Sequence, residues 1–303
     1  MVKTTAFNIK GTVMEFGKYH PIIIFTYLVA MIVFSCVFMH PVYLCISLVS
    51  AVSYGVVLNG IKKQAKHLGY ILPMAGILCI LNPLFNHQGQ TVLYYIGENP
   101  VTSESVVYGI AAAMMIISVV GWFSCYSKIM TSDKFVYLFG KVIPSLSLVL
   151  SMALRFVPRF HNQLKNVADA QNSLNTPKGF VNSIKYGTQV LSSMLIWSFE
   201  SALTTADSMK SRGYGTNRRT AFSVYRFDRY NIVVFSVVAV LIIYIIIGAV
   251  LGVTRFTYYP NIQMLNVNPY NISVLCAYIM LAFMPHIIEF AEVIRWQATK
   301  SKI

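Results

Sequence analysis

The sequence predicts an all-α, polytopic membrane protein with about six transmembrane helices and two long amphipathic helices in a cytoplasmic region. Two features of the sequence lead to this class. Hydrophobic residues make up 56% of the 303 residues and charged residues only 11%, whereas roughly 25% of a typical soluble domain is charged. Several uncharged runs also approach the twenty or so residues that a helix needs to cross a bilayer. This composition excludes a disordered chain and argues against a soluble enzyme.

Six apolar, uncharged runs mark the expected membrane helices. His40 and Pro41 alone separate the first two runs, which predicts a tight turn between two helices. Pro73 and the Asn82-Pro83 pair interrupt the third run, where we expect a kink. The runs cover residues 22–39, 42–58, 70–85, 106–123, 232–253 and about 272–288.

Positive charge orients these helices, because Lys and Arg collect on the cytoplasmic side of a membrane protein. The orienting residues precede the first run, separate the second from the third, and follow the fourth, whereas residues 86–104 contain no Lys or Arg. Both termini are therefore expected in the cytoplasm. The first twenty residues contain no early apolar stretch, so no cleavable signal peptide is expected. The orienting residues are Lys3, Lys10, Lys18, Lys62, Lys63, Lys66 and Lys128.

The chain divides into three predicted segments: transmembrane helices 1–4 in residues 1–125, a cytoplasmic domain in 126–230, and transmembrane helices 5–6 in 231–303. The cytoplasmic segment has helical periodicity, a break at 177–179, and a helix end at Gly213, where glycine can adopt a left-handed backbone. The apolar stretch within 135–152 fits either a membrane-surface segment or a partial crossing. The apolar faces of the two helices carry Phe156, Phe160, Leu164, Val167, Gln171 and Leu174, and Leu191, Leu195, Ala202, Ala206 and Met209.

The sequence lacks the motifs that would make the chain itself a catalyst. No GxxxxGK[ST] loop is available to surround phosphates, so we expect neither ATP hydrolysis nor a bound cofactor. The six histidines are scattered singly, and no metal site is expected. The net charge of +14 fits the cytoplasmic loops of a membrane protein. Because no basic stretch is interleaved with aromatic residues in a polar domain, no nucleic-acid partner is expected.

The cytoplasmic segment contains two groups of short motifs. The first group is Leu154-Arg155-Phe156-Val157-Pro158 followed by Ala170-Gln171. The second group is Ala202, Ala206, Met209 and Arg212-Gly213-Tyr214. In this order and spacing the motifs resemble the transmembrane T component of energy-coupling-factor (ECF) transporters, and the resemblance covers essentially the whole chain. It implies a non-catalytic scaffold in the cell membrane of a prokaryote, which joins two ATP-binding-cassette ATPases to a substrate-binding membrane subunit.

The resemblance also implies where the ATPases dock, since each coupling helix of that family ends in a short arginine-containing motif. The second motif is intact as Ser211-Arg212-Gly213. The first departs from the pattern: counting from Ala170-Gln171, the expected arginine falls on Leu174 and the expected glycine on Asn175. We therefore expect docking at Gln171 and Leu174 and at Ser211, Arg212 and Gly213. The residues expected to shape the coupling helices are Arg155, Pro158, Ala170, Ala202, Ala206 and Met209.

The resemblance predicts a subunit of a vitamin or metal-ion importer, and two alternatives from other classes stay open. One is a membrane enzyme acting on a lipid-linked substrate, for which only His286, Glu289 and Glu292 are candidate residues. The other is a stand-alone carrier.

A set of basic residues fits either a rim around the ATPase interface or an anchor to anionic lipid. These residues are Lys210, Arg218, Arg219, Arg226 and Arg229.

Overall fold

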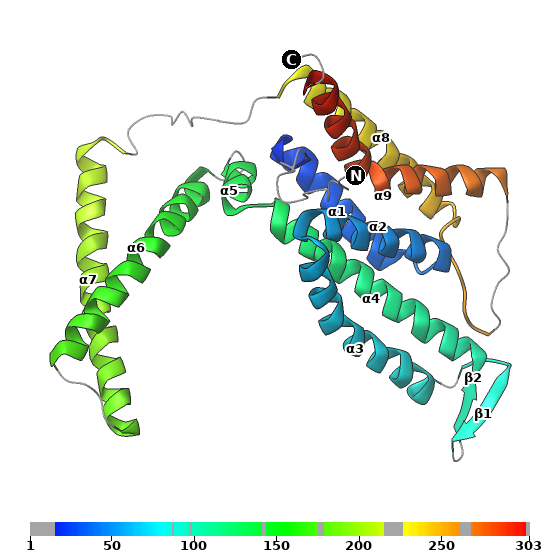
Figure 1. Ribbon diagram of the computed structural model, residues 1–303, viewed down its shortest axis with the longest axis horizontal. Helices are drawn as coiled ribbons and strands as arrows, with labels where there is room; N and C mark the ends of the chain where they lie inside the picture. The colour runs from blue at the N-terminus through cyan, green and yellow to red at the C-terminus, as the bar shows by residue number, and fades with distance from the viewer. Residues whose placement is uncertain are drawn as a thin grey trace, which may run out of the picture. The chain divides into compact units, whose positions relative to one another are not determined.

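The computed structural model describes residues 16–86, 88–96, 99–140, 144–174, 179–214, 227–260 and 268–300. Within these ranges the chain is almost entirely helical (Figure 1), which confirms the predicted all-α class. Its contacts divide the chain into two compact units. One unit comprises Met1–Thr131 and Tyr225–Ile303, and the other comprises Ser132–Val224.

The first unit contains the apolar helices. Five of its described helices are long and apolar enough to cross a membrane, and α1 is a shorter apolar helix of 17 residues. Helix α1 corresponds to the first of the six expected runs, and the five long helices correspond to the other five. The elements of this unit are the 3₁₀ turn Phe16–Lys18, α1 (Pro21–Val37), α2 (Pro41–Asn59), α3 (Ile61–Phe85), β1 (Val92–Ile96), β2 (Asn99–Thr102), α4 (Ser103–Ile129), α8 (Arg229–Val250) and α9 (Pro269–Lys300).

A His-Pro pair begins each of the first two helices. The Nδ1 atoms of His20 and His40 accept hydrogen bonds from the backbone N–H groups of Ile22 and Val42, each at 3.3 Å. The proline after each histidine removes no hydrogen bond from its helix, because the first N–H groups of a helix have no partner within it. These caps allow α1 and α2 to be joined by only three residues, which confirms the predicted tight turn.

Helix α1 supplies much of the core of this unit. Its side chains Ile23, Ile24, Tyr27, Leu28 and Met31 are fully buried. They pack against residues of α2, α4, α8 and α9 in one hydrophobic cluster. This face of α1 therefore lies inside the unit, whereas Val33 and Val37 toward the end of the helix are exposed.

Buried polar groups tie these helices together, since hydrocarbon offers them no water. The indole N–H of Trp122 on α4 donates to Ser47 Oγ on α2 at 3.0 Å. Ser47 Oγ lies 2.6 Å from Ser35 Oγ on α1. The carbonyl of Ala282 on α9 accepts from Ser50 Oγ at 2.6 Å and from the Tyr27 hydroxyl at 3.2 Å.

A small β-hairpin is the described exception to the all-α class. Strands β1 and β2 pair antiparallel between α3 and α4, with Val92 opposite Thr102 and Ile96 opposite Asn99. The prediction did not include it. The sequence Val-Leu-Tyr-Tyr-Ile of β1 is rich in β-branched and aromatic residues, which favour strands.

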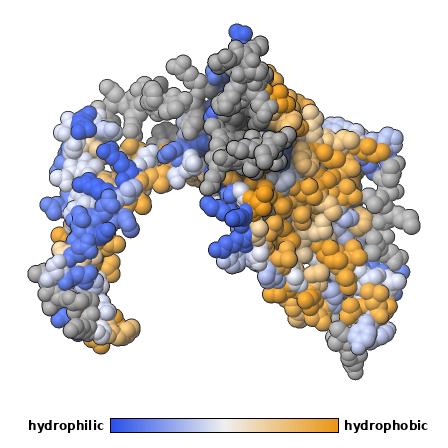
Figure 2. Space-filling model, in the orientation of Figure 1, coloured by the Kyte–Doolittle hydropathy of each residue, from blue (hydrophilic) through white to orange (hydrophobic). Residues whose placement is uncertain are grey.

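The second unit consists of α5 (Ser132–Gly140), α6 (Pro144–Leu174) and α7 (Phe180–Ser211). The two long amphipathic helices are therefore present, with 31 and 32 residues. Of the stretch 135–152, left open by the sequence, residues 135–140 belong to α5 and residues 144–152 form the first turns of α6. In Figure 2, hydrophilic side chains gather on α6 and α7, whereas apolar ones dominate the face of the first unit that is in view.

Candidate functional site: the groove between α6 and α7

Helices α6 and α7 run antiparallel as a long hairpin. Near the closed end, the Tyr186 hydroxyl on α7 donates to the Ala168 carbonyl on α6 at 2.8 Å. Further along, the rings of Phe160 and Trp197 meet edge to face with centroids 5.2 Å apart. This register places the end of α6 beside the start of α7, and residues 152–159 of α6 across from the last turns of α7.

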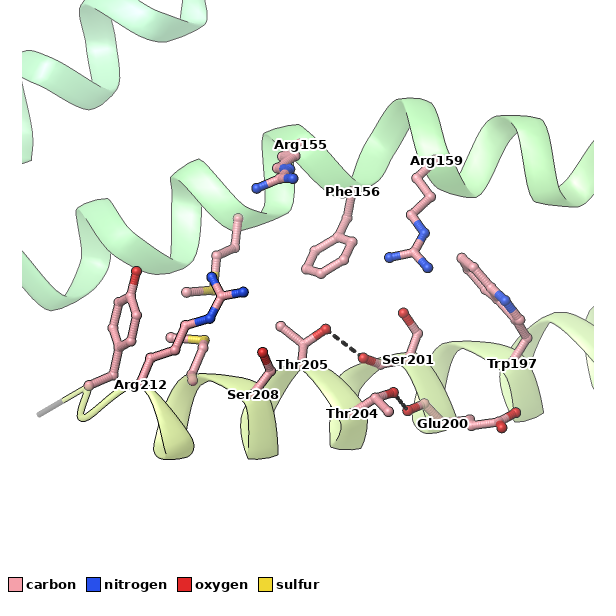
Figure 3. Close-up of a pocket in the computed structure, with 13 residues that line it drawn as sticks. Arg155, Phe156, Arg159, Trp197, Glu200, Ser201, Thr204, Thr205, Ser208 and Arg212 are labelled. Carbon is pink, nitrogen blue, oxygen red and sulfur yellow. Dashed lines mark hydrogen bonds between the residues drawn. The ribbon is translucent and has the colours of Figure 1, made fainter.

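The open half of the hairpin encloses a groove of about 930 Å³ (Figure 3). Side chains from both helices point into it, and guanidinium, hydroxyl and aromatic groups make up most of its wall. The lining residues are Met152, Arg155, Phe156 and Arg159 of α6, Trp197, Glu200, Ser201, Thr204, Thr205, Ser208 and Met209 of α7, and Arg212 and Tyr214 beyond it.

The charge in the groove is strongly positive. Arg155 and Arg159 extend from α6, and Arg212 reaches toward α6 from the end of α7. Glu200 is the one acidic lining residue, and its side chain points away from α6. Among the residues that the structure describes, no carboxylate forms an ion pair with any of the three arginines. Their donors are therefore available to an external acceptor, which a guanidinium can bind through two parallel hydrogen bonds.

Arg159 is held in place by an aromatic ring. Its guanidinium carbon lies 5.4 Å from the centroid of the Trp197 ring. Such a cation–π contact contributes about 0.5 to 1 kcal/mol at an exposed site. The contact orients Arg159 along the wall and leaves its hydrogen-bond donors unused.

The end of α7 has the geometry of a complete Schellman motif. Gly213 has a positive φ of 72°. Its N–H donates to the Lys210 carbonyl at 3.0 Å, and the Tyr214 N–H donates to the Met209 carbonyl at 3.1 Å. Arg212 is the last residue before this turn. The predicted motif Ser211-Arg212-Gly213 is therefore a helix end of defined shape, with an exposed arginine at its tip.

The structure brings some of the predicted site residues together and separates others. Arg155, Met209 and Arg212 line the groove, and Ser211 and Gly213 flank Arg212. Pro158, Ala170, Ala202 and Ala206 are exposed and lie outside the lining. Gln171 is half-buried near the end of α6, and Leu174 is the last residue of that helix. The Leu174 side chain and Asn175 lie outside the described residues.

Several lining residues were not predicted as part of a site. Trp197 and the hydroxyl residues Ser201, Thr205 and Ser208 meet Arg155 and Arg159 only through the pairing of α6 with α7. A single sequence contains no direct signal for that register. Of the predicted basic set, Lys210 in the last turn of α7 and Arg229 at the start of α8 are exposed, and the other three members lie outside the described residues.

A second polar cluster lies in the membrane unit at α9. His286 Nε2 shares a hydrogen bond of 2.9 Å with Ser53 Oγ, and its ring packs on Tyr54 and Phe283. Glu289 lies beside the Tyr54 hydroxyl, and the Glu292 side chain is not described. No group of three His, Cys, Asp or Glu residues is placed to hold a metal ion in the described part of the chain. This cluster joins α2 to α9.

Comparison with known proteins identifies the family. The cobalt transport protein family (CbiQ) matches residues 20–222, which include every described element from α1 to α7. The chain belongs to this family. The matched range includes the residues of the groove and of the Schellman turn.

Curated relatives of this CbiQ-family chain carry the name energy-coupling factor transporter transmembrane protein EcfT. The protein from Lactobacillus helveticus is 30% identical over 100 residues, which are 32% of this chain and 36% of the relative. That from Lacticaseibacillus paracasei is 36% identical over 92 residues, 29% and 34% of the two chains. That from Streptococcus equi subsp. equi is 24% identical over 213 residues, 65% and 75%. The first two alignments span about a third of each relative. Together with the family match, they confirm the resemblance to the T component.

Proposed function

We propose that the chain is the energy-coupling membrane subunit of an ECF-type importer. In this proposal it transmits ATP-driven motion of two ATPase subunits to a membrane subunit that captures a vitamin or a metal ion. The observation that carries the proposal is the exposed Arg212 at the Schellman-closed end of α7. A guanidinium at such a tip suits carboxylates or carbonyls on a partner, and Gly213 permits close approach of the partner backbone.

The two predicted docking motifs lie at opposite ends of the helix hairpin. Leu174 ends α6 at the closed end, whereas Arg212 follows α7 at the open end. At a rise of 1.5 Å per residue, the 32 residues of α7 span about 48 Å. Two separate ATPases can be served at this spacing. A long helix pair also acts as a stiff lever, since bending it would break backbone hydrogen bonds and the contacts between α6 and α7.

An exposed apolar stripe on α7 supports a membrane partner. Leu191, Leu195, Phe199 and Leu203 recur at four-residue spacing, and more than half of each side chain is exposed. A stripe of this kind marks an interaction surface. We assign it to the substrate-binding membrane subunit, whose own surface must be largely apolar. The lipid bilayer is the partner of the membrane unit, and ATP hydrolysis belongs to the ATPases.

Co-purification in mild detergent tests the docking role of Arg212. The variant Arg212→Glu is expected to lose at least one ATPase, because a charge reversal at a paired arginine removes about 2 kcal/mol or more, or roughly thirtyfold in affinity. Lys165→Glu is the matched control, since Lys165 is exposed near the middle of α6 and outside the groove. It should retain both ATPases. Retention of both ATPases by Arg212→Glu, with full transport, would contradict the proposal.

Reconstitution into liposomes distinguishes the energy-coupling role from that of a stand-alone carrier. Liposomes that contain only this chain are expected to take up neither vitamins nor metal ions, with or without ATP. Uptake should require the ATPases and the substrate-binding subunit in the same vesicles. Sustained uptake by the chain alone would favour the carrier.

A further inference from the structure

The β1–β2 hairpin exposes an unusual amount of apolar and aromatic surface for a short loop. Leu93, Tyr94 and Tyr95 are 65%, 68% and 61% exposed. Tyr94 pairs with Val101 and Tyr95 with Pro100 on β2. Neighbouring residues of a strand point to opposite faces. The two tyrosines therefore give each face of the hairpin one exposed aromatic ring.

Hydrogen bonds fix the hairpin to the start of α4. The backbone N–H of Thr91 donates to Glu104 Oε1 at 3.3 Å, and its hydroxyl lies 2.7 Å from Ser103 Oγ. The Thr102 hydroxyl donates to the Gln88 carbonyl at 3.0 Å. Glu104 is itself buried. The hairpin is thus held in a set position on a membrane helix.

Helix α3, which contacts β2, also exposes apolar side chains. Near the end of that helix, Ile80 and Phe85 are 65% and 80% exposed. Both α3 and α4 are long and apolar enough to cross a membrane. The hairpin connects the end of α3 to the start of α4 and lies at the adjoining ends of these two helices (Figure 1). A segment that joins two membrane-crossing helices is expected near the surface of the bilayer.

The chemistry of the hairpin suits the headgroup layer rather than the hydrocarbon. Tyrosine is enriched at membrane interfaces, where its ring contacts apolar chains and its hydroxyl reaches water. A two-stranded sheet has unpaired backbone groups on both edges, and these need water or headgroup partners. The only charges in residues 86–104 are Glu98 and Glu104. No Lys or Arg is present in this segment to draw it toward anionic lipid.

We propose that the β1–β2 hairpin is seated in the phospholipid headgroup layer at the end of α3 and α4, with Tyr94 or Tyr95 against lipid. Because the two rings face opposite ways, one face of the hairpin rests on the bilayer and the other faces water. The hairpin thereby fixes the depth of α3 and α4 in the bilayer. This role is independent of the ATPase docking proposed above.

Spin-label accessibility in vesicles of zwitterionic phosphatidylcholine tests this placement. Single cysteines replace Tyr94 or Tyr95 in a full-length background from which the native cysteines are removed, and collisions with oxygen and with an aqueous nickel chelate are compared. Ile77→Cys on the exposed surface of α3 gives the lipid reference, and Asp207→Cys on α7 gives the water reference. The native cysteines replaced by alanine are Cys36, Cys45, Cys79, Cys125 and Cys276.

At one of the two tyrosine positions, the ratio of oxygen to nickel collisions should lie well above the Asp207 value, toward the Ile77 value. The other position should resemble Asp207. If both positions match Asp207, the hairpin stands in water and the proposal is wrong. If both labels are shielded from oxygen and nickel alike, another protein surface covers the hairpin, and the proposal is equally wrong. Circular dichroism verifies that each variant retains its helices.

Discussion

Gly213 is the residue on which the shape of the docking tip depends most directly. Its φ of 72° is unfavourable for any side chain, so Gly213→Ala should destabilise the end of α7 by about 1 to 2 kcal/mol. Gly187 gives the matched control, because it lies inside α7 with open space around its Cβ position. Gly187→Ala should stabilise the helix by about 0.5 to 1 kcal/mol. Hydrogen exchange along α7 measures both effects, and shifts of the same sign would contradict the assigned turn.

His40 makes the cap of α2 sensitive to pH. Its Nδ1 accepts the Val42 N–H only while that nitrogen is unprotonated. Burial lowers the pKa of His40 from its ordinary value of 6.5, so the unfolded chain takes up the proton first as pH falls. Stability contributed here is therefore present above pH 6.5 and is lost as pH falls through the lowered folded-state pKa.

Unfolding followed between pH 8 and pH 5 measures this contribution. The variant His40→Asn keeps a side-chain acceptor at the cap without a titrating ring, so its stability should fall less over this range than that of the native chain. His20, which caps α1 in the same way, remains in both proteins. Equal pH dependence in the two proteins would show that His40 does not titrate with folding.

At the scale of helices, α8 and α9 approach each other through Gly248. A Cβ at this position would lie 2.9 Å from both methyl carbons of Val274, too close for an unshifted contact. Gly248→Ala should therefore destabilise the membrane unit by about 1 to 3 kcal/mol. The double variant Gly248→Ala with Val274→Ala should recover part of that loss, because the shortened side chain vacates the space. Purely additive effects in denaturant unfolding would rule out the close packing.

Hydropathy predicted where the helices of this protein lie better than it predicted which helices pack against one another. The third run was expected from Tyr70, whereas α3 begins at Ile61, because Lys62, Lys63 and Lys66 can sit on a helix that extends beyond the bilayer. The burial of α1 was not predictable, because an apolar helix has the same sequence pattern whether it faces lipid or protein. In the groove, Arg212 was found from its motif, but its convergence with Arg155 and Trp197 depends on a register that no local pattern specifies.

At the scale of the whole molecule, the distribution of charge leads to a prediction of topology. The start of α3 carries exposed Lys62 and Lys63, whereas the segment between α3 and α4 lacks Lys and Arg. Positive residues stay on the cytoplasmic side during insertion. The start of α3 should therefore face the cytoplasm, and the β1–β2 hairpin the outside.

Labelling of intact cells with a membrane-impermeant maleimide tests this topology. In the cysteine-free background, Gln88→Cys should react from outside, whereas Lys63→Cys should react only after the membrane is permeabilised. Both side chains are exposed, so a lack of reaction cannot come from burial within this chain. The opposite pattern would place the groove of α6 and α7 outside the cell, because an even number of crossings, α3 and α4, separates Lys63 from it. Arg212 would then be out of reach of any ATPase that uses cytoplasmic ATP, so this one measurement also tests the condition on which the coupling role depends.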